Sequence, residues 1–310
     1  MVRTPKKVFR NVTVRTFIFV LRRITTSSID SGSKAIIREM TEEGRTRDVG
    51  WVSQRDMEVS HLHNLLLHSE KTAPALFTKC MQGGVTVGSA FELRYGFKTA
   101  DDKRFLATQC LSEFHKPFVR SADISRYLPL FPTGFVDYRP DVMTANRRTA
   151  RPGDRARFER PKVVVARMGR TLLATFDDTG VFVKDAMLLL SRTNSVERLK
   201  MLTGLLNSQL LQYLYQNYFA TIDVLKNALL ALPLPNHGSD ATDKALHDQM
   251  VALVEQMLKL NRQLKETNLP QAKTIIQRQI KTTDQQIDKL VYNLYKLTDE
   301  EIAIVEEGVK

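Results

Sequence analysis

The chain has 310 residues, of which 43% are hydrophobic and 26% charged, as is typical of a folded protein with one or two cores. Its longest apolar run near the N-terminus, residues 16–21, is too short for a signal sequence or a membrane span. The sequence therefore predicts neither secretion nor a membrane partner, and we expect a cytoplasmic protein.

The net charge of +12 is unevenly distributed along the chain. Lys and Arg outnumber Asp and Glu by twelve to seven in residues 1–60 and by twenty to thirteen in residues 61–190, whereas residues 191–310 hold fourteen of each. This asymmetry favours a part that faces a polyanion, followed by a neutral scaffold. A basic surface without any specific partner is the alternative.

The N-terminal third is predicted to hold strands and a linker. Residues 9–23 are apolar and β-branched, which predicts one or two strands. They are either the end of a sheet whose other strands lie elsewhere or an ordinary edge strand. Residues 26–60 are polar and predict a linker with a short helix at 35–40, and residues 62–67 begin a further apolar turn or helix.

A long basic loop is predicted at residues 119–162, where five prolines interrupt the apolar pattern. From residue 139 to residue 162 its cations outnumber its acids, which there are Asp141, Asp154 and Glu159. The basic residues are Arg139, Arg147, Arg148, Arg151, Arg155, Arg157, Arg160 and Lys162. Arginine pairs with phosphates and with guanine edges, and a nearby aromatic ring such as that of Tyr138 can stack on bases, so this loop is the candidate DNA-binding site.

The next stretch predicts a β-meander and then a helix. Residues 162–167 and 171–176 are β-branched runs, and residues 177–180 have the composition of a hairpin turn before a third strand at 181–183. Residues 195–218 carry leucines at helical spacing, with Asn194 and Glu197 placed as a capping box. The segment LPLP at residues 232–235 ends the following element.

Two long helices are predicted after residue 239, joined by a turn at Pro270. Their apolar residues recur at alternating spacings of four and three, which predicts an antiparallel coiled-coil hairpin. The first series is Leu246, Met250, Leu253, Met257, Leu260 and Leu264, and the second is Ile276, Ile280, Thr283, Ile287, Leu290 and Leu294.

The motifs of several enzyme classes are missing from the sequence. It has no Pro-Pro pair, which an adenine-N6 methyltransferase uses to hold a flipped base, and no P-loop. The glycine-rich residues 83–88 precede a strand rather than a helix, so they do not fit a cofactor-binding turn. Residues 101–103 read best as a solvated turn rather than a nuclease centre. We expect no catalytic residue and no cofactor in this chain.

Metal and disulfide sites are not predicted either. His61, His63 and His68 lack further ligands at a convincing spacing. Cys80 and Cys110 are too few for a disulfide framework, and we expect buried thiols in a reducing compartment.

Taken in order along residues 85–305, these motifs resemble the TaqI-like C-terminal specificity domain of type II restriction-modification enzymes and adenine-specific DNA methyltransferases. The resemblance rests on the strands after residue 160, on LLNS at 205–208, on LPLP at 232–235 and on ID at 287–288 leading into VYNLYKLT. Residues 96–100, GFKTA, resemble the family's GIKTG loop, with Ala100 where a glycine would tolerate a positive φ.

The resemblance implies an α+β fold in which a mixed, β-rich recognition domain precedes a C-terminal antiparallel helical arm. Residues 1–25 would be the remnant of the last strand of a methyltransferase domain, 26–84 a linker with a helical segment, 85–238 the DNA target-recognition domain, and 239–310 a spacer or docking arm. Candidate DNA-binding residues are Lys98, Arg139, Arg147, Arg148, Arg151, Arg155, Arg157 and Tyr138.

The expected partners are double-stranded DNA and a methyltransferase or nuclease subunit or domain, which would also bind S-adenosylmethionine. Two alternatives stay open. The chain could be a fragment of a site-specific adenine-N6 DNA methyltransferase, or a nucleic-acid or protein-interaction module without sequence preference.

Overall fold

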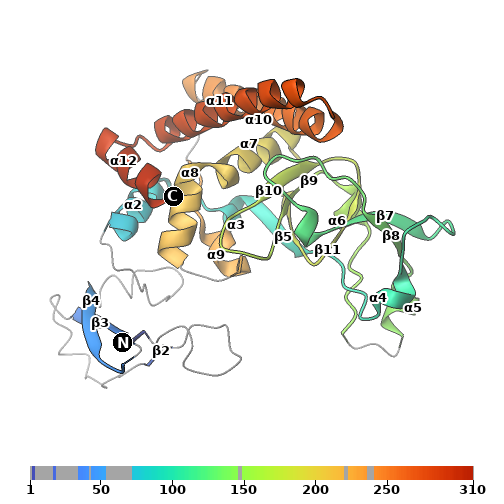
Figure 1. The fold of residues 1–310 in the computed structure, drawn as a ribbon, viewed down its shortest axis with the longest axis horizontal. Coiled ribbons are helices and arrows are strands. Elements are labelled where there is room, and N and C mark those ends of the chain that lie inside the picture. The colour runs from blue at the N-terminus through green and yellow to red at the C-terminus, as the bar shows by residue number, and fades with distance from the viewer. Residues whose placement is uncertain are drawn as a thin grey trace.

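The fold combines helices and β-sheets, which confirms the expected α+β class (Figure 1). The computed structural model describes residues 2–3, 17–18, 34–41, 43–53, 72–145, 149–219, 223–235 and 241–309. The strands are β1 (Val2–Arg3), β2 (Phe17–Ile18), β3 (Lys34–Met40), β4 (Thr46–Ser53), β5 (Phe91–Tyr95), β6 (Leu106–Ala107), β7 (His115–Arg120), β8 (Gly134–Asp137), β9 (Lys162–Val165), β10 (Ala174–Asp177), β11 (Phe182–Lys184) and β12 (Met187–Ser191).

The helices lie mainly in the second half of the chain. They are α2 (Thr72–Cys80), α3 (Val87–Ala90), α4 (Asp102–Phe105), α5 (Pro140–Thr144), α6 (Ala156–Glu159), α7 (Val196–Asn207), α8 (Gln209–Leu214), α9 (Lys226–Ala231), α10 (Ala241–Glu266), α11 (Pro270–Leu294) and α12 (Asp299–Gly308), with short 3-10 turns at Met81–Gly83 and Ser121–Asp123 and a π-helical turn at Tyr215–Phe219.

The described part of the N-terminal segment is a small sheet in the order β2-β1-β3-β4. Strands β3 and β4 form an antiparallel hairpin, and β1 lies parallel to β3. The short helix predicted at residues 35–40 is therefore wrong. The apolar residues there belong to a strand, which pairs with a second β-rich run across a tight turn closed by a hydrogen bond from Gly44 N to Thr41 O at 3.0 Å. The apolar segment at residues 62–67 lies outside the described residues.

The central sheet has the strand order β10-β9-β12-β5 and is buried on both faces. Val163 and Val165 on β9 belong to the larger core beneath the helices, whereas Val164 between them belongs to a smaller core shared with the second sheet. Met187 and Leu188 on β12 divide in the same way. Burial on both faces explains why these strands are continuous apolar runs rather than alternating ones.

The second sheet has the order β11-β7-β8-β6, so the predicted meander is only partly correct. Strands β9 and β10 do form an antiparallel hairpin. The third strand, β11, leaves the central sheet and pairs parallel with β7. Residues 177–180 are thus a crossing between sheets, because Asp177 turns inward to an ion pair with Lys162 and the next apolar residues are buried in the smaller core.

The helix predicted at residues 195–218 is present but is divided at Ser208 into α7 and α8. Ser195, not Asn194, is the N-cap, and its side chain accepts a hydrogen bond from Arg198 N. Asn194 instead adopts a positive φ of 56° in the preceding turn. Ser208 is a second serine N-cap, and its hydroxyl accepts a hydrogen bond from Leu211 N. The first turn of α8 is therefore capped in the same way as that of α7.

Asn207 and Gln212 join these helices to the open edge of the central sheet. The Asn207 amide accepts from Ala174 N at 3.1 Å and donates to Ala174 O at 2.8 Å. The Gln212 amide does the same at Leu172, accepting from the backbone N at 2.9 Å and donating to the backbone O at 2.8 Å. Both side chains are buried, so each acts as a strand would, bonding backbone groups of β10 and of the residues leading into it that β9 leaves unpaired.

Helices α10 and α11 form the predicted antiparallel hairpin, and it lies against α7 and α8 (Figure 1). Met250, Met257 and Leu260 on α10 are buried, as are Ile287 and Leu290 on α11. Polar contacts add to this packing. Arg126 bonds to Asp284 at 2.7 Å, Lys200 to Glu255 at 2.6 Å, and Gln209 N to Asp288 at 2.8 Å. Because the hairpin covers α7 and α8, deletion of residues 244–310 should destabilise the rest of the fold.

Burial predicts that substitutions of two leucines in the hairpin change the stability of the protein by different amounts. Leu260 is 6% exposed, whereas Leu269, in the turn, is 69% exposed. Leu260→Ala should lower the free energy of unfolding by about 2–5 kcal/mol, since it leaves a cavity. Leu269→Ala should change it by less than about 0.5 kcal/mol. Urea denaturation of both variants measures this, and equal effects would contradict the packing described.

The buried carboxyl of Asp288 should make the stability of the protein depend on pH. This carboxyl is buried close to Asp284, and burial raises its pKa to about 6 in spite of hydrogen bonds from Gln209. The folded state therefore binds a proton at this carboxyl more tightly than the unfolded state does. The free energy of unfolding consequently rises as the pH falls through 6, and this contribution is lost as the pH rises above 6.

Asp288→Asn should abolish this dependence and raise the melting temperature at pH 7.5. At pH 7.5 the substitution should raise the free energy of unfolding by up to about 3 kcal/mol, and at pH 4 it should give no such gain. Melting curves of variant and wild type at several pH values test this, because titration of every other group is common to both proteins. Parallel curves from pH 7.5 to 4 would show that Asp288 is not perturbed.

Candidate nucleic-acid interface

A groove of about 750 Å³ collects positive charge from parts of the chain that are far apart in sequence. The six cations that line it come from β5, the loop after β5, the loop leading into α6, α6 itself, the residues after β9, and the start of α9. They are Arg94, Lys98, Arg151, Arg157, Arg167 and Lys226. One lining residue, Asp185, is acidic, and the exposed ring of Tyr95 also lies here. We call this the basic groove.

Close backbone contacts fix one wall of the basic groove. Gly96 N donates to Ala186 O at 2.8 Å and Phe97 N donates to Val183 O at 2.9 Å. A Cβ at Gly96 would lie 2.3 Å from Val183 O, so only glycine permits this approach. Lys98 and Arg151 then exchange two backbone hydrogen bonds, of 2.8 and 2.7 Å. The loop after β5 and the basic loop are thereby held together.

Ala100 adopts a φ of 65° at the position where the resembled loop has glycine. The loop accepts this backbone strain, because the residues around it are pinned. Thr99 is fully buried, and its hydroxyl donates to Asp102 at 2.5 Å. Asp101 caps α4 by accepting from Arg104 N. Residues 101–103 are therefore the start of a helix rather than a turn, with Asp102 and Lys103 exposed to solvent as the sequence predicted.

Two predicted DNA-binding arginines lie outside the basic groove and carry acidic partners. Arg139 holds both oxygens of Asp137, with Nε at 2.8 Å from Oδ1. These bonds hold the pKa of Asp137 below its usual range. Arg155 pairs with Glu159 at 2.6 Å. Both arginines are neutralised locally, which lowers the charge each can offer to a polyanion.

A second depression of about 450 Å³ adjoins the basic groove and shares Arg167 and Asp185 with it. Lys184 lies here between two carboxylates, at 2.6 Å from Asp185 and 3.2 Å from Asp102. Arg120 lines the same depression. The positively charged surface therefore continues from the basic groove into this depression, where acidic side chains neutralise a larger share of the positive charge.

The structure sorts the predicted site residues into four groups. Lys98, Arg151 and Arg157 meet in the basic groove. Arg139 and Arg155 lie outside its lining, and Arg147 and Arg148 lie outside the described residues. Tyr138 is 8% exposed, its ring packs against Phe158 and Phe182, and its hydroxyl donates to Gly153 O at 2.6 Å. Both the ring and the hydroxyl of Tyr138 therefore make contacts within the core and do not face a DNA base.

Sequence reasoning missed Arg94, Tyr95, Arg167 and Lys226 as groove residues. Arg94 and Tyr95 end the half-buried strand β5, and Arg167 follows the buried strand β9. A cation at the end of a strand is therefore the signal that could have identified Arg94 and Arg167, and Tyr95 adjoins Arg94. Lys226 begins a short helix and gives no such signal.

Lys162 was grouped with the basic loop but is fully buried. Its ammonium donates to Asp177 and to Phe158 O, both at 2.5 Å, and Asp177 also accepts from the Thr179 hydroxyl at 2.6 Å. Burial lowers the pKa of Lys162, and the attraction of Asp177 opposes that shift. The ammonium of Lys162 thus ties α6, which carries Arg157, to the paired strands β9 and β10.

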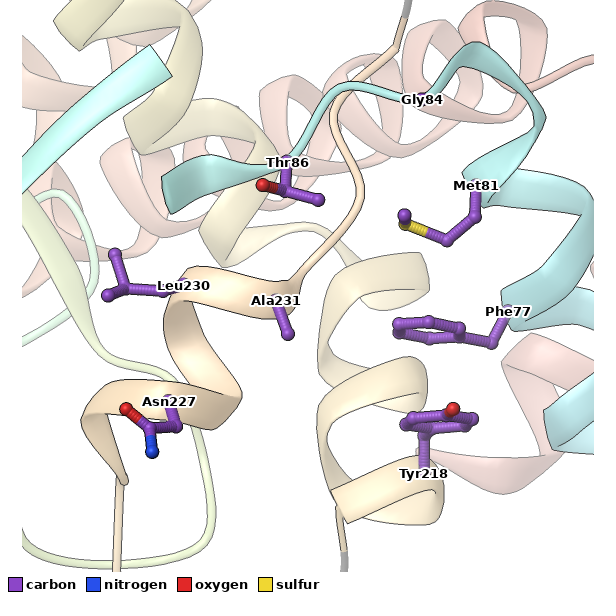
Figure 2. Close-up of a pocket in the computed structure, with 8 residues that line it drawn as sticks. All are labelled: Phe77, Met81, Gly84, Thr86, Tyr218, Asn227, Leu230 and Ala231. Atoms are coloured by element: carbon purple, nitrogen blue, oxygen red, sulfur yellow. The ribbon is translucent and has the colours of Figure 1, made fainter. Parts of the chain in front are cut away.

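Another pocket, of about 540 Å³, lies between α2, the π-helical turn and α9 (Figure 2). Figure 2 shows the rings of Phe77 and Tyr218 facing each other, and their centroids are 3.7 Å apart. Met81, Leu230 and Ala231 add apolar surface, and Tyr218 is the one titratable residue among those that line it. Burial raises the pKa of Tyr218, so no lining residue in the described part of the chain titrates near neutral pH.

The cysteines differ from each other. Cys80 is buried and its pKa is raised to about 12, chiefly by burial, whereas Cys110 is exposed, so the expectation of two buried thiols holds for Cys80 alone. Within the described ranges, no three His, Cys, Asp or Glu side chains gather as a metal site, and the histidines at 61, 63 and 68 fall outside those ranges. No helix in the described part of the chain has the length and apolar character to cross a bilayer.

Comparison with known proteins bears directly on the part of the chain that forms most of the basic groove. Residues 116–234 match the family described as the TaqI-like C-terminal specificity domain. The match confirms the resemblance over this range. Arg151, Arg157, Arg167 and Lys226 lie within it, and the loop that carries Lys98 precedes it.

Among solved structures, the chain is similar to the Type IIL restriction-modification enzyme MmeI, solved in complex with DNA. The two are 12% identical with a TM-score of 0.48, and the similarity covers 90% of this chain and 41% of that one. This chain thus spans less than half the length of that protein. No curated protein matches it.

The buried ion pair predicts an asymmetric mutational effect. Lys162→Met should lower the free energy of unfolding by about 3–5 kcal/mol, because it leaves Asp177 charged and buried. The double variant Lys162→Met with Asp177→Leu should recover part of that loss. Lys103→Met, at an exposed position, should change stability by less than about 0.5 kcal/mol. Chemical denaturation distinguishes these cases, and a fully stable Lys162→Met protein would contradict the geometry.

Proposed function

We propose that this chain is the DNA target-recognition module of a restriction-modification system and binds double-stranded DNA through the basic groove. The single observation that carries the proposal is the convergence of six cations, from within and beside the range that matches the specificity domain, around one acid. Such a concentration of positive charge suits the phosphate backbone of DNA, where binding releases condensed counterions.

The basic groove also contains groups suited to reading bases. Tyr95 is 46% exposed and adjoins Arg94 at the end of β5. Arginine can bond bidentately to a guanine edge, and an aromatic ring gives apolar contact with bases. Arg94 is held by Glu92, which orients its side chain along the strand. In this proposal Arg94 and Tyr95 read sequence, while the other cations of the basic groove position the duplex.

Catalysis would come from a partner. Methyl transfer or cleavage would be performed by a methyltransferase or nuclease, as a separate subunit or as another domain, and S-adenosylmethionine would be bound there. Leu269 and Ile275, at the tip of the α10–α11 hairpin, are 69% and 57% exposed. This apolar tip is the surface that we assign to contact with that partner.

DNA binding should depend steeply on salt. Each phosphate contact adds about 0.9 to the slope of log affinity against log salt concentration, and several cations line the basic groove. Arg167→Gln should reduce the slope by about 1 and weaken binding to all sequences. Arg139→Gln is the matched control, because Asp137 already neutralises that arginine.

Fluorescence anisotropy with a labelled duplex, from 50 to 300 mM salt, measures both slopes. A flat dependence for the wild type would remove the proposal of a DNA-binding groove. Competition with unrelated duplexes then separates sequence-specific binding from general affinity for nucleic acid.

A further inference from the structure

Arg157 differs from its neighbours in how rigidly its guanidinium is held. The guanidinium lies over the ring of Phe158, at 4.9 Å from its centroid, and packs directly on Gly153, where a Cβ would fall 1.5 Å from Nη2. Gly153 is itself fixed, with a φ of 79° and a hydrogen bond from the Tyr138 hydroxyl to its carbonyl. The side chain is therefore held in one place, in contrast to an exposed lysine.

The charge of Arg157 has no acidic partner within ion-pair distance among the described residues. Its Nε–H is buried and donates to no hydrogen-bond acceptor among the described residues, and Asp154 acts on it only as a more distant charge. Burial lowers the pKa of Arg157, which remains charged at neutral pH. Four other arginines of this region are each paired with a carboxylate. The pairs are Arg94 with Glu92, Arg126 with Asp284, Arg139 with Asp137, and Arg155 with Glu159.

We propose that Arg157 is the principal phosphate anchor of the basic groove and that a DNA phosphodiester supplies its missing anionic partner. A guanidinium that is already immobilised and partly desolvated loses little freedom on binding, and its interaction with an anion is stronger than in water. Lys98, Lys226 and Arg167 surround the same space, so the anion would also be attracted by their charge. The inference rests on the proposed DNA-binding function and gives it a specific point of attachment.

Phosphate contact, rather than base reading, follows from the position of Arg157. The residue extends from the short helix α6 at the base of the loop and is braced by core aromatic rings, with Phe158 and Phe182 stacked at 4.5 Å. A residue held in this way would fix the position of the DNA duplex in the groove whatever its base sequence. The exposed side chains at the end of β5 are better placed to change with the target.

The experiment compares two arginines at the start of α6, Arg155 at the N-cap and Arg157 two residues later. Arg157→Gln should weaken binding roughly tenfold on every duplex tested and reduce the salt slope by about 1. Arg155→Gln should leave both unchanged, because Arg155 is exposed and already paired with Glu159. Arg157→Met keeps the apolar packing on Phe158 and repeats the test if the Gln variant melts early.

Each outcome decides the inference. If the wild type binds with a steep salt slope but both Arg157 variants behave like Arg155→Gln, the anchor is elsewhere and the DNA-binding proposal survives. If Arg157→Gln changes the preferred sequence without changing the slope, Arg157 reads a base and the phosphate assignment is overturned. If the wild type does not bind DNA, both proposals fail together.

Discussion

Two buried amides, on Asn207 and Gln212, hold the helical layer against the open edge of the central sheet. Each forms a donor and acceptor pair with one backbone residue of the segment that includes β10, as a neighbouring strand would. A side chain can do this only if its helix lies at a fixed distance and rotation. The break at Ser208 provides that geometry, because it gives the two amides separate helical segments.

The position of the basic groove follows from this arrangement. With helices on one face of the central sheet and a second sheet on the other, the strands can carry charge only at their ends and in the loops between them. Arg94 and Arg167 lie at such ends, while the loops that carry Lys98 and Arg151 are joined by two backbone hydrogen bonds. The buried Lys162–Asp177 pair secures the helix that presents Arg157. Part of the positive charge of the groove thus lies at strand ends and in loops because the interiors of the buried strands are apolar.

Sequence patterns predicted elements well and side-chain roles poorly. Hydrophobic spacing identified the α10–α11 hairpin and the strands after residue 160, because burial sets that spacing directly. It could not show that β11 joins another sheet or that the hairpin covers α7, since those contacts depend on residues far apart in the chain. Counting arginines also failed to separate Arg157 from Arg155, because the difference is the presence of Glu159 and Gly153 in space.

The most direct test of this account is hydrogen exchange of the chain with and without duplex DNA. Amides at the groove walls, residues 94–98 and 150–157, should exchange more slowly in the complex, because DNA would cover them and stabilise their paired loops. Amides on the outer face of α10 and α11 should be unchanged. Protection confined to α10 and α11, with the groove loops unaffected, would contradict the assignment of the DNA interface to the basic groove.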